Sequence, residues 1–268
     1  MDITKYYAKE GELPLDNILD DGGFTSIFRS IACIGDSLSS GELESTKEDG
    51  SSGYHDYYDI SWGQYISRAA GVPVLNFSRG GMTAKEYIES WGENNGVWDK
   101  DKACQAYIFA LGVNDLICHI MDMGTADDVS LTSRDGNNKA TFAGQLGEIL
   151  CRYREIEPKS RLFLMSMPRE TSDGDRVKKV KEEHSKLMND IAAKNEFVYV
   201  IDLYKYAPVY DEEFKKHFYL GGHLNAGGYL VTAKMVMSYI DYIVRHNYED
   251  FIQAGFIGKG VHSTRAKW

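Results

Sequence analysis

The 268-residue chain has little of several features that would mark particular protein classes. It contains no run of about 20 apolar residues, so the sequence predicts no helix that spans a bilayer. Residues 1–7 include no apolar stretch of the signal-peptide type, and we therefore expect a cytoplasmic protein. The chain has only 4 cysteines, which lie far apart. This argues against a disulfide framework and favours buried free thiols at Cys33, Cys104 and Cys151.

Positive charge is also scarce. The chain has 30 Lys and Arg against 40 Asp and Glu, a formal net charge of −10. Nucleic acids and anionic membranes require a basic surface, so both are disfavoured as partners. No phosphate-binding glycine motif stands between a predicted strand and a helix, and no His/Cys/acid set has metal-ligand spacing. We therefore expect no cofactor and no metal ion.

What the chain does have is an alternation of apolar runs and amphipathic stretches. The apolar runs predict strands at residues 29–34, 72–76, 103–111, 161–167 and 197–201. Helical stripes separate them, which is typical of parallel βαβ crossovers. We expect an α/β protein, a three-layer α/β/α sandwich around a central, mostly parallel five-stranded sheet.

The length suits one sizeable domain. We place that domain at residues 29–247, after an N-terminal extension of residues 1–28 that packs on it. Residues 248–268 are polar and are predicted to form a tail or a dimer arm, and self-association stays open. Residues 38–59 carry no apolar period and are predicted to form a long loop.

The most informative segment begins where the first predicted strand ends. It reads Ile34-Gly35-Asp36-Ser37-Leu38-Ser39-Ser40-Gly41, so a glycine turns the chain and a serine follows. Ligands of open α/β sheets bind at the carboxyl ends of the strands. The segment resembles the first block of the SGNH hydrolases, the GDSL esterase/lipase family.

Three further segments resemble that family's other blocks, in the family's order. They are Asn76-Phe77-Ser78-Arg79-Gly80-Gly81-Met82-Thr83, Leu111-Gly112-Val113-Asn114-Asp115 and Gly222-His223-Leu224-Asn225-Ala226-Gly227-Gly228-Tyr229. The resemblance runs from about residue 30 to about residue 245. It implies an SGNH/flavodoxin-like fold, with Gly81 as the oxyanion glycine, Asn114 as the block's asparagine and His223 as the histidine.

These residues suit nucleophilic catalysis on an ester. A serine hydroxyl is a weak nucleophile near neutral pH and needs a positioned base, a role that His223 could fill for Ser37. Attack on the carbonyl creates an oxyanion, which N–H donors stabilise. Gly81 and Asn114 are the predicted donors, and the resemblance implies the Ser37 N–H as a third. Standing alone, each residue would be better explained as part of an ordinary turn.

One departure from the family pattern concerns the acid that orients the histidine. The family usually carries an aspartate three residues before it, where this chain has Leu220. A backbone carbonyl of residues 218–221 is the favoured replacement, because it would hold a proton on Nδ1. The alternative is a displaced carboxylate among Asp211, Glu212 and Glu213. Asp36 and Asp115 are interpreted as structural residues that bind backbone groups.

The leading hypothesis is a serine esterase that removes a short acyl group, such as acetyl, from a small or carbohydrate-like alcohol through an acyl-Ser37 intermediate. The polar segment 38–59 favours this, since rings such as Tyr54 and Tyr57 could stack on a sugar. A long-chain lipase or thioesterase of the same family is one alternative. Another is a binding homologue that lacks the triad acid, and acyl transfer to a second alcohol stays open.

Overall fold

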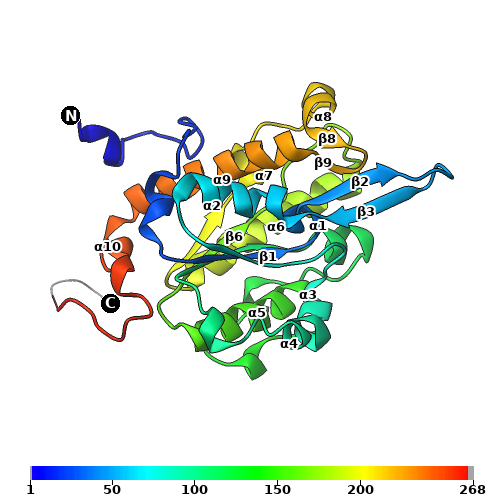
Figure 1. The fold of residues 1–268 in the computed structure, drawn as a ribbon. Coiled ribbons are helices and arrows are strands. Elements are labelled where there is room, and N and C mark those ends of the chain that lie inside the picture. Colours follow the sequence, from blue (N-terminus) through cyan, green and yellow to red (C-terminus); the bar gives the residue numbers. More distant parts are fainter. Residues whose placement is uncertain (1, 265–268) are drawn as a thin grey trace.

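A parallel five-stranded sheet lies at the centre of the computed structural model, which describes residues 2–264 (Figure 1). The strand order is β4-β1-β5-β6-β7. The strands are β1 (Ile31–Gly35), β4 (Val74–Ser78), β5 (Ala106–Ala110), β6 (Arg161–Met165) and β7 (Val198–Ile201). All five lie where the apolar runs predict them, and the α/β/α fold class is confirmed.

The register of the sheet brings three strand ends to one level. Gly35 at the end of β1 pairs with Ser78 of β4 on one side and with Ala110 of β5 on the other. From β1 the chain adds β4 on one side and then crosses to add β5 on the other side. The direction in which strands are added therefore reverses between β1 and β5. Ligands of doubly wound sheets bind in the crevice at such a switch point.

Helices cover both faces of the sheet. The core on one face includes side chains of α2 (Trp62–Ala70) and α9 (Ala226–His246). The core on the other includes α5 (Phe142–Ile156) and α6 (Asp175–Lys194). Shorter helices are α1 (Ser37–Ser40), α3 (Ala84–Glu86), α4 (Gly92–Asn94), α7 (Leu203–Tyr206), α8 (Glu212–Phe218) and α10 (Tyr248–Phe251). A π-helical turn, Tyr87–Trp91, joins α3 to α4.

Two helices begin at residues whose side chains cap them. Thr83 Oγ1 accepts a hydrogen bond from the Glu86 N–H at 3.1 Å and begins α3. Asn225 Oδ1 accepts from the Gly228 N–H at 3.0 Å and begins α9. These side chains satisfy N–H groups that the first helical turn leaves unpaired. Cys33, Cys104 and Cys151 are buried free thiols, as the sequence predicts.

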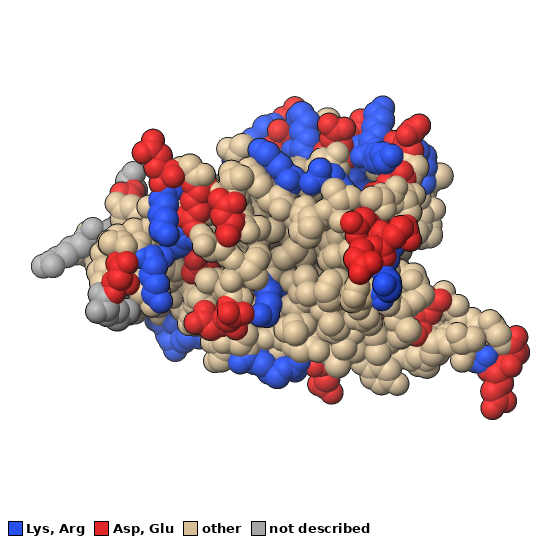
Figure 2. All heavy atoms as spheres, turned by 90° about the horizontal axis from the view of Figure 1, so that it is seen from above, with Lys and Arg blue, Asp and Glu red and all other residues tan. Residues whose placement is uncertain are grey.

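The prediction of a loop over residues 38–59 is wrong. The segment contains the helical turn α1 and an antiparallel hairpin of β2 (Glu42–Thr46) and β3 (Ser52–Asp56). Both faces of its strands carry mostly polar residues. The hairpin therefore lacks the alternation of apolar and polar residues by which strands are recognised in a sequence. The hairpin projects from the body, and charged side chains lie at its far end (Figures 1 and 2).

The two ends of the described chain pack on the domain. The Phe24 N–H donates to Asp241 of α9 at 3.0 Å, and Glu12 forms an ion pair with Arg245 of α9 at 2.6 Å. Residues beyond α9 bury Phe251, and residues 265–268 of the predicted tail lie outside the described residues. None of the helices in residues 2–264 is long and apolar enough to span a membrane.

Candidate active site

Ser37 is the first residue of α1 and comes directly after β1 and the connecting Asp36. Asp36 caps this short helix, because its Oδ1 accepts a hydrogen bond from the Leu38 N–H at 3.1 Å. The side chain is buried, with 3% of the residue exposed. This confirms the structural role predicted for Asp36 and fixes the backbone that carries Ser37.

Gly81 and Asn114 follow the two strands that flank β1. Gly81 has φ +71°, a left-handed conformation that favours glycine, and it lies in the turn after β4. The Asn114 amide donates through Nδ2 to the carbonyl of Met82 at 3.0 Å. This bond joins the turn after β4 to the turn after β5, so the two predicted oxyanion donors share one local framework.

Asp115 makes a second link between the same two turns. Its Oδ1 accepts from the Ala84 N–H at 2.9 Å, and the residue is 1% exposed. Burial raises the pKa of the Asp115 carboxyl to about 6. The backbone contact agrees with the predicted structural role, although it bridges to the neighbouring segment and does not stay within its own turn.

His223 lies in a two-residue ladder, where β9 (His223–Leu224) pairs with β8 (Tyr219–Leu220). The hairpin of β2 and β3 faces its ring. Nε2 lies 3.1 Å from Glu42 Oε1, and Nδ1 lies 3.8 Å from Glu44 Oε2. The Tyr54 ring packs edge-on against the imidazole at a centroid distance of 5.7 Å. Two carboxylates therefore flank the predicted base.

The acid candidates from the sequence lie elsewhere. Asp211 caps α8 through the Phe214 N–H at 2.8 Å, and Glu213 is 3.4 Å from His217. The expected backbone carbonyl is not found either, because the buried Nδ1 of His223 has no hydrogen-bond partner in the described chain. In the described chain, the carboxylates within 4 Å of the His223 ring belong to the hairpin.

The two hairpin carboxylates differ in their environment. Burial raises the pKa of the Glu42 carboxyl, and the neighbouring His223 opposes part of that rise. Glu44 accepts hydrogen bonds from the Gly222 N–H at 2.6 Å and from the Ser52 hydroxyl at 2.8 Å, and these bonds lower its pKa. Glu44 is therefore the carboxylate that stays ionised more readily.

Sequence reasoning missed Glu42 and Glu44. A signal was available, since the two residues are two positions apart shortly after the predicted nucleophile Ser37, and they share one face if the segment is a strand. Their partners across the hairpin are Asp56 and Tyr54, which place two further polar side chains on that face. Without the expectation of a strand, the alternation had no structural meaning.

A cavity of about 470 Å³ contains three of the four predicted site residues, Ser37, Asn114 and His223. Gly81 is not one of the residues that line it. Much of its wall is apolar and is formed by Leu38, Trp62, Val113, Ile117, Met165, Met167, Pro168, Val177, Leu203 and Leu224. In the described residues His223 has no hydrogen bond to Ser37, and its Nε2 lies beside Glu42.

Another part of this wall is formed by Glu170, Asp173 and Lys181, which belong to a cluster of charged side chains. Lys181 is 5% exposed and its ammonium group lies 2.9 Å from Asp173 and 3.2 Å from Glu170. Lys215 lies 2.9 Å from the other oxygen of Glu170. The two lysines and the two carboxylates balance in charge. This part of the cavity wall therefore belongs to a polar cluster that carries no net charge.

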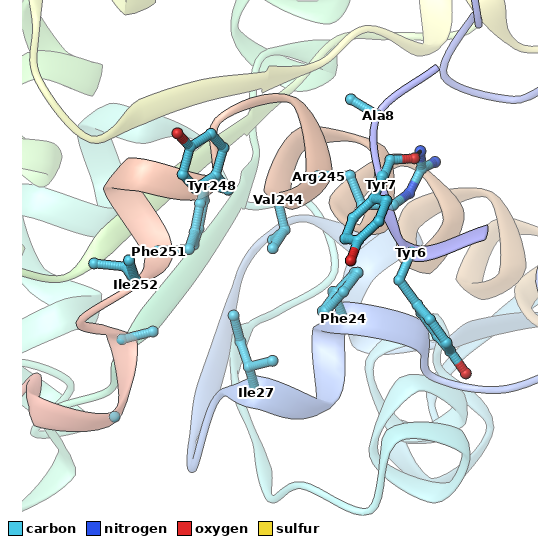
Figure 3. Close-up of a pocket in the computed structure, with 12 residues that line it drawn as sticks. Tyr6, Tyr7, Ala8, Phe24, Ile27, Val244, Arg245, Tyr248, Phe251 and Ile252 are labelled. Atoms are coloured by element: carbon cyan, nitrogen blue, oxygen red, sulfur yellow. Dashed lines mark hydrogen bonds between the residues drawn. The ribbon is translucent and has the colours of Figure 1, made fainter. Parts of the chain in front are cut away.

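A second cavity of about 510 Å³ lies between the N-terminal segment and the end of α9 (Figure 3). Aromatic and aliphatic side chains surround it, among them Tyr6, Tyr7, Phe24, Ile27, Val244, Tyr248, Phe251 and Ile252. None of the predicted site residues lines this cavity. The cavity at the carboxyl ends of β1 and β5 is therefore the candidate active site.

Comparisons with known proteins agree with this fold. A family two carbohydrate esterase from Clostridium thermocellum in complex with cellohexaose superimposes with a TM-score of 0.56 at 16% identity, over 81% of this chain and 64% of that one. A family 3 carbohydrate esterase from Clostridium thermocellum gives 0.52 at 15% identity, over 81% and 97%. A possible lipase from Chitinophaga pinensis gives 0.54 at 15% identity, over 81% and 99%.

No curated protein sequence matches the chain. The family model of the GDSL-like lipase/acylhydrolases, in contrast, matches residues 33–231. That span begins inside β1, passes through all four sequence blocks and ends in α9. The chain therefore belongs to the GDSL-like lipase/acylhydrolase family.

Proposed function

We propose that this protein is a serine esterase that hydrolyses a carboxylic ester through an acyl-enzyme on Ser37. One observation carries the proposal: Ser37, Asn114 and His223, from three separate parts of the chain, line a single cavity at the sheet's switch point. Membership of an acylhydrolase family supports the same reaction class.

In the proposed reaction, His223 Nε2 takes the proton of the Ser37 hydroxyl as Oγ attacks the ester carbonyl carbon. The carbonyl oxygen becomes an oxyanion and receives hydrogen bonds from the Ser37 and Gly81 N–H groups and from the Asn114 amide. The imidazolium then gives its proton to the departing alkoxide, which leaves as an alcohol. Water repeats the sequence on the acyl-serine and releases the acid.

The substrate we favour is a short-chain ester, such as an acetyl group on a carbohydrate-like alcohol. The likeness to two carbohydrate esterases supports a carbohydrate alcohol, although that likeness concerns the fold. Tyr54 and Tyr57 of the hairpin region are 57% and 54% exposed. Their rings are available to stack on a sugar that approaches the cavity mouth.

A longer acyl chain is the second candidate, and the apolar wall of the cavity favours it. Met165, Met167, Val177 and Leu203 are part of that wall. Apolar linings bind apolar chains because contact removes hydrocarbon surface from water, at roughly 25 cal/mol per Å². The two candidates differ in acyl length and share one mechanism.

The test combines a substrate panel with a labelled nucleophile. Nitrophenyl esters of two to sixteen acyl carbons, with acetylated sugars beside them, report activity and acyl length together. We expect a fluorophosphonate probe to label the wild type, and Ser37→Ala to lose labelling and activity. Ser90→Ala, at an exposed serine, is the matched control. Ser37→Ala with activity within tenfold of wild type would overturn the assignment.

A further inference from the structure

We infer that Glu44 is the positioning carboxylate of His223, supplied by the hairpin that follows the nucleophile. The inference rests on the proposed serine mechanism and assigns the residue that holds the imidazole in its working form. That form carries the proton on Nδ1, so that Nε2 is free to accept from the serine. A hydrogen-bond acceptor that faces Nδ1 selects this tautomer.

The described residues offer one carboxylate on the Nδ1 side of the ring. Nδ1 is buried and has no hydrogen-bond partner, which makes it an unsatisfied donor when it carries the proton. The nearest carboxylate oxygen is Glu44 Oε2 at 3.8 Å. An approach of about 1 Å would form a hydrogen bond, and catalytic contacts are often long until substrate is bound.

The surroundings of Glu44 hold its carboxylate next to the histidine. Oε2 accepts from the Gly222 N–H, the residue immediately before His223, and Oε1 accepts from the Ser52 hydroxyl across the hairpin. These two donors fix both oxygens and favour the ionised form. An ionised carboxylate only accepts hydrogen bonds, so it admits the Nδ1–H tautomer and stabilises the imidazolium that forms on proton transfer.

Glu42 is the competing candidate, but it faces the other nitrogen. Its Oε1 lies 3.1 Å from Nε2, the atom that must accept the proton of Ser37. A carboxylate in that place competes with the serine for Nε2 and does not select the productive tautomer. Glu42 therefore holds the ring at rest, and the ring leaves it when the serine is engaged.

The first experiment compares kcat and KM for three variants with the best ester of the panel. We expect Glu44→Ala to lower kcat by at least about 100-fold with KM within about threefold, since removing the triad acid of a serine protease costs roughly 10⁴. Glu44→Gln should also lose kcat, because its amide can donate to Nδ1 as well as accept from it and so no longer selects the Nδ1–H tautomer. Glu48→Ala, in the turn of the same hairpin, is the control and should change kcat less than twofold.

A rescue variant separates positioning from simple stability. Leu220 is directly opposite His223 in the β8–β9 ladder, where side chains of paired residues are neighbours. We expect Leu220→Asp to restore kcat at least tenfold in the Glu44→Ala background. Equal kcat for Glu44→Ala and wild type would overturn the inference. A larger loss in Glu42→Ala than in Glu44→Ala would also overturn it and transfer the role to Glu42.

A measurement that needs no activity keeps the inference distinct from the proposed function. Long-range ¹H–¹⁵N spectra identify which nitrogen of neutral His223 carries the proton, with His223→Gln used for assignment. We expect Nδ1–H in Glu42→Ala, where no carboxylate accepts from Nε2, and a mixture in Glu42→Ala combined with Glu44→Ala. Nε2–H in Glu42→Ala would refute the role of Glu44 even if the protein hydrolysed esters. A failure of fluorophosphonate labelling together with Nδ1–H would refute only the proposed function.

Discussion

Replacement of Asp36 by asparagine should make the protein more stable at alkaline pH and leave it little changed at acidic pH. Asp36 is 3% exposed, and burial raises the pKa of its carboxyl to about 7 from an ordinary value of 3.8. Between those values the folded protein binds more protons at this site than the unfolded chain. The free energy of unfolding therefore falls as pH rises through that window.

The size of the effect follows from the shift. A difference of one pKa unit corresponds to about 1.36 kcal/mol, so a shift from 3.8 to about 7 is at most about 4 kcal/mol, fully developed above pH 7. Asparagine keeps the oxygen that accepts from the Leu38 N–H and removes the titration. The variant should gain up to that amount over wild type at pH 8 and almost nothing near pH 4.

Urea unfolding followed by tryptophan fluorescence at several pH values between 4 and 8 measures this difference directly. The comparison of Asp36→Asn with wild type cancels the other titrating groups that the two proteins share. Asp101→Asn, at an exposed aspartate, is the matched control and should show no pH-dependent gain. Parallel stability curves for Asp36→Asn and wild type would refute the argument that burial holds this carboxyl in its protonated form.

Four other substitutions test separate parts of the structure. Gly81→Ala and Asn114→Ala should lower kcat more than they raise KM, and the loss of kcat in Asn114→Ala should be about 10²–10³-fold. Steady-state kinetics that show only a raised KM would contradict this prediction. Asn225→Ala should lower the free energy of unfolding by about 1 kcal/mol, because it removes the N-terminal cap of α9. An unchanged midpoint of urea unfolding would contradict this prediction. Tyr229→Phe should cost about 1–3 kcal/mol, because its buried hydroxyl donates to the Glu42 carbonyl at 2.6 Å, and chemical denaturation that shows no loss would count against this.

The predictable part of this fold is the part encoded by local patterns. Each sheet strand is a short apolar run, and each run predicts a strand because both faces of a parallel sheet are buried. The capping residues Thr83 and Asn225 likewise act on backbone groups within three residues of themselves. Ser37 and Asn114 were predicted from the family resemblance of their sequence blocks. They line one cavity because both follow strands whose ends share one edge.

The unpredicted part depends on contacts between distant segments. The hairpin β2–β3 has no apolar face, so its stability comes from pairing and from its seat against the body. Leu43 is one of its few apolar side chains that pack on the core. The side chains that face His223 come from a segment far from it in sequence. No local pattern at His223 indicates Glu42 or Glu44, and Leu220 indicates only that the usual acid is absent.

The loop before His223 has space and a hydrogen-bond donor for a carboxylate from a distant segment of the chain. Gly221 has φ +67°, and a Cβ at this position would come within 2.4 Å of the Glu44 carboxylate, so the turn requires glycine for its backbone and for the space. Gly222 follows and donates the N–H that Glu44 accepts. Leu220 is 47% exposed and occupies none of that space. The sequence Leu220-Gly221-Gly222 thus combines an absent local acid with room and a donor for a distant one, which is the arrangement expected if the hairpin carboxylate has taken over the orienting role.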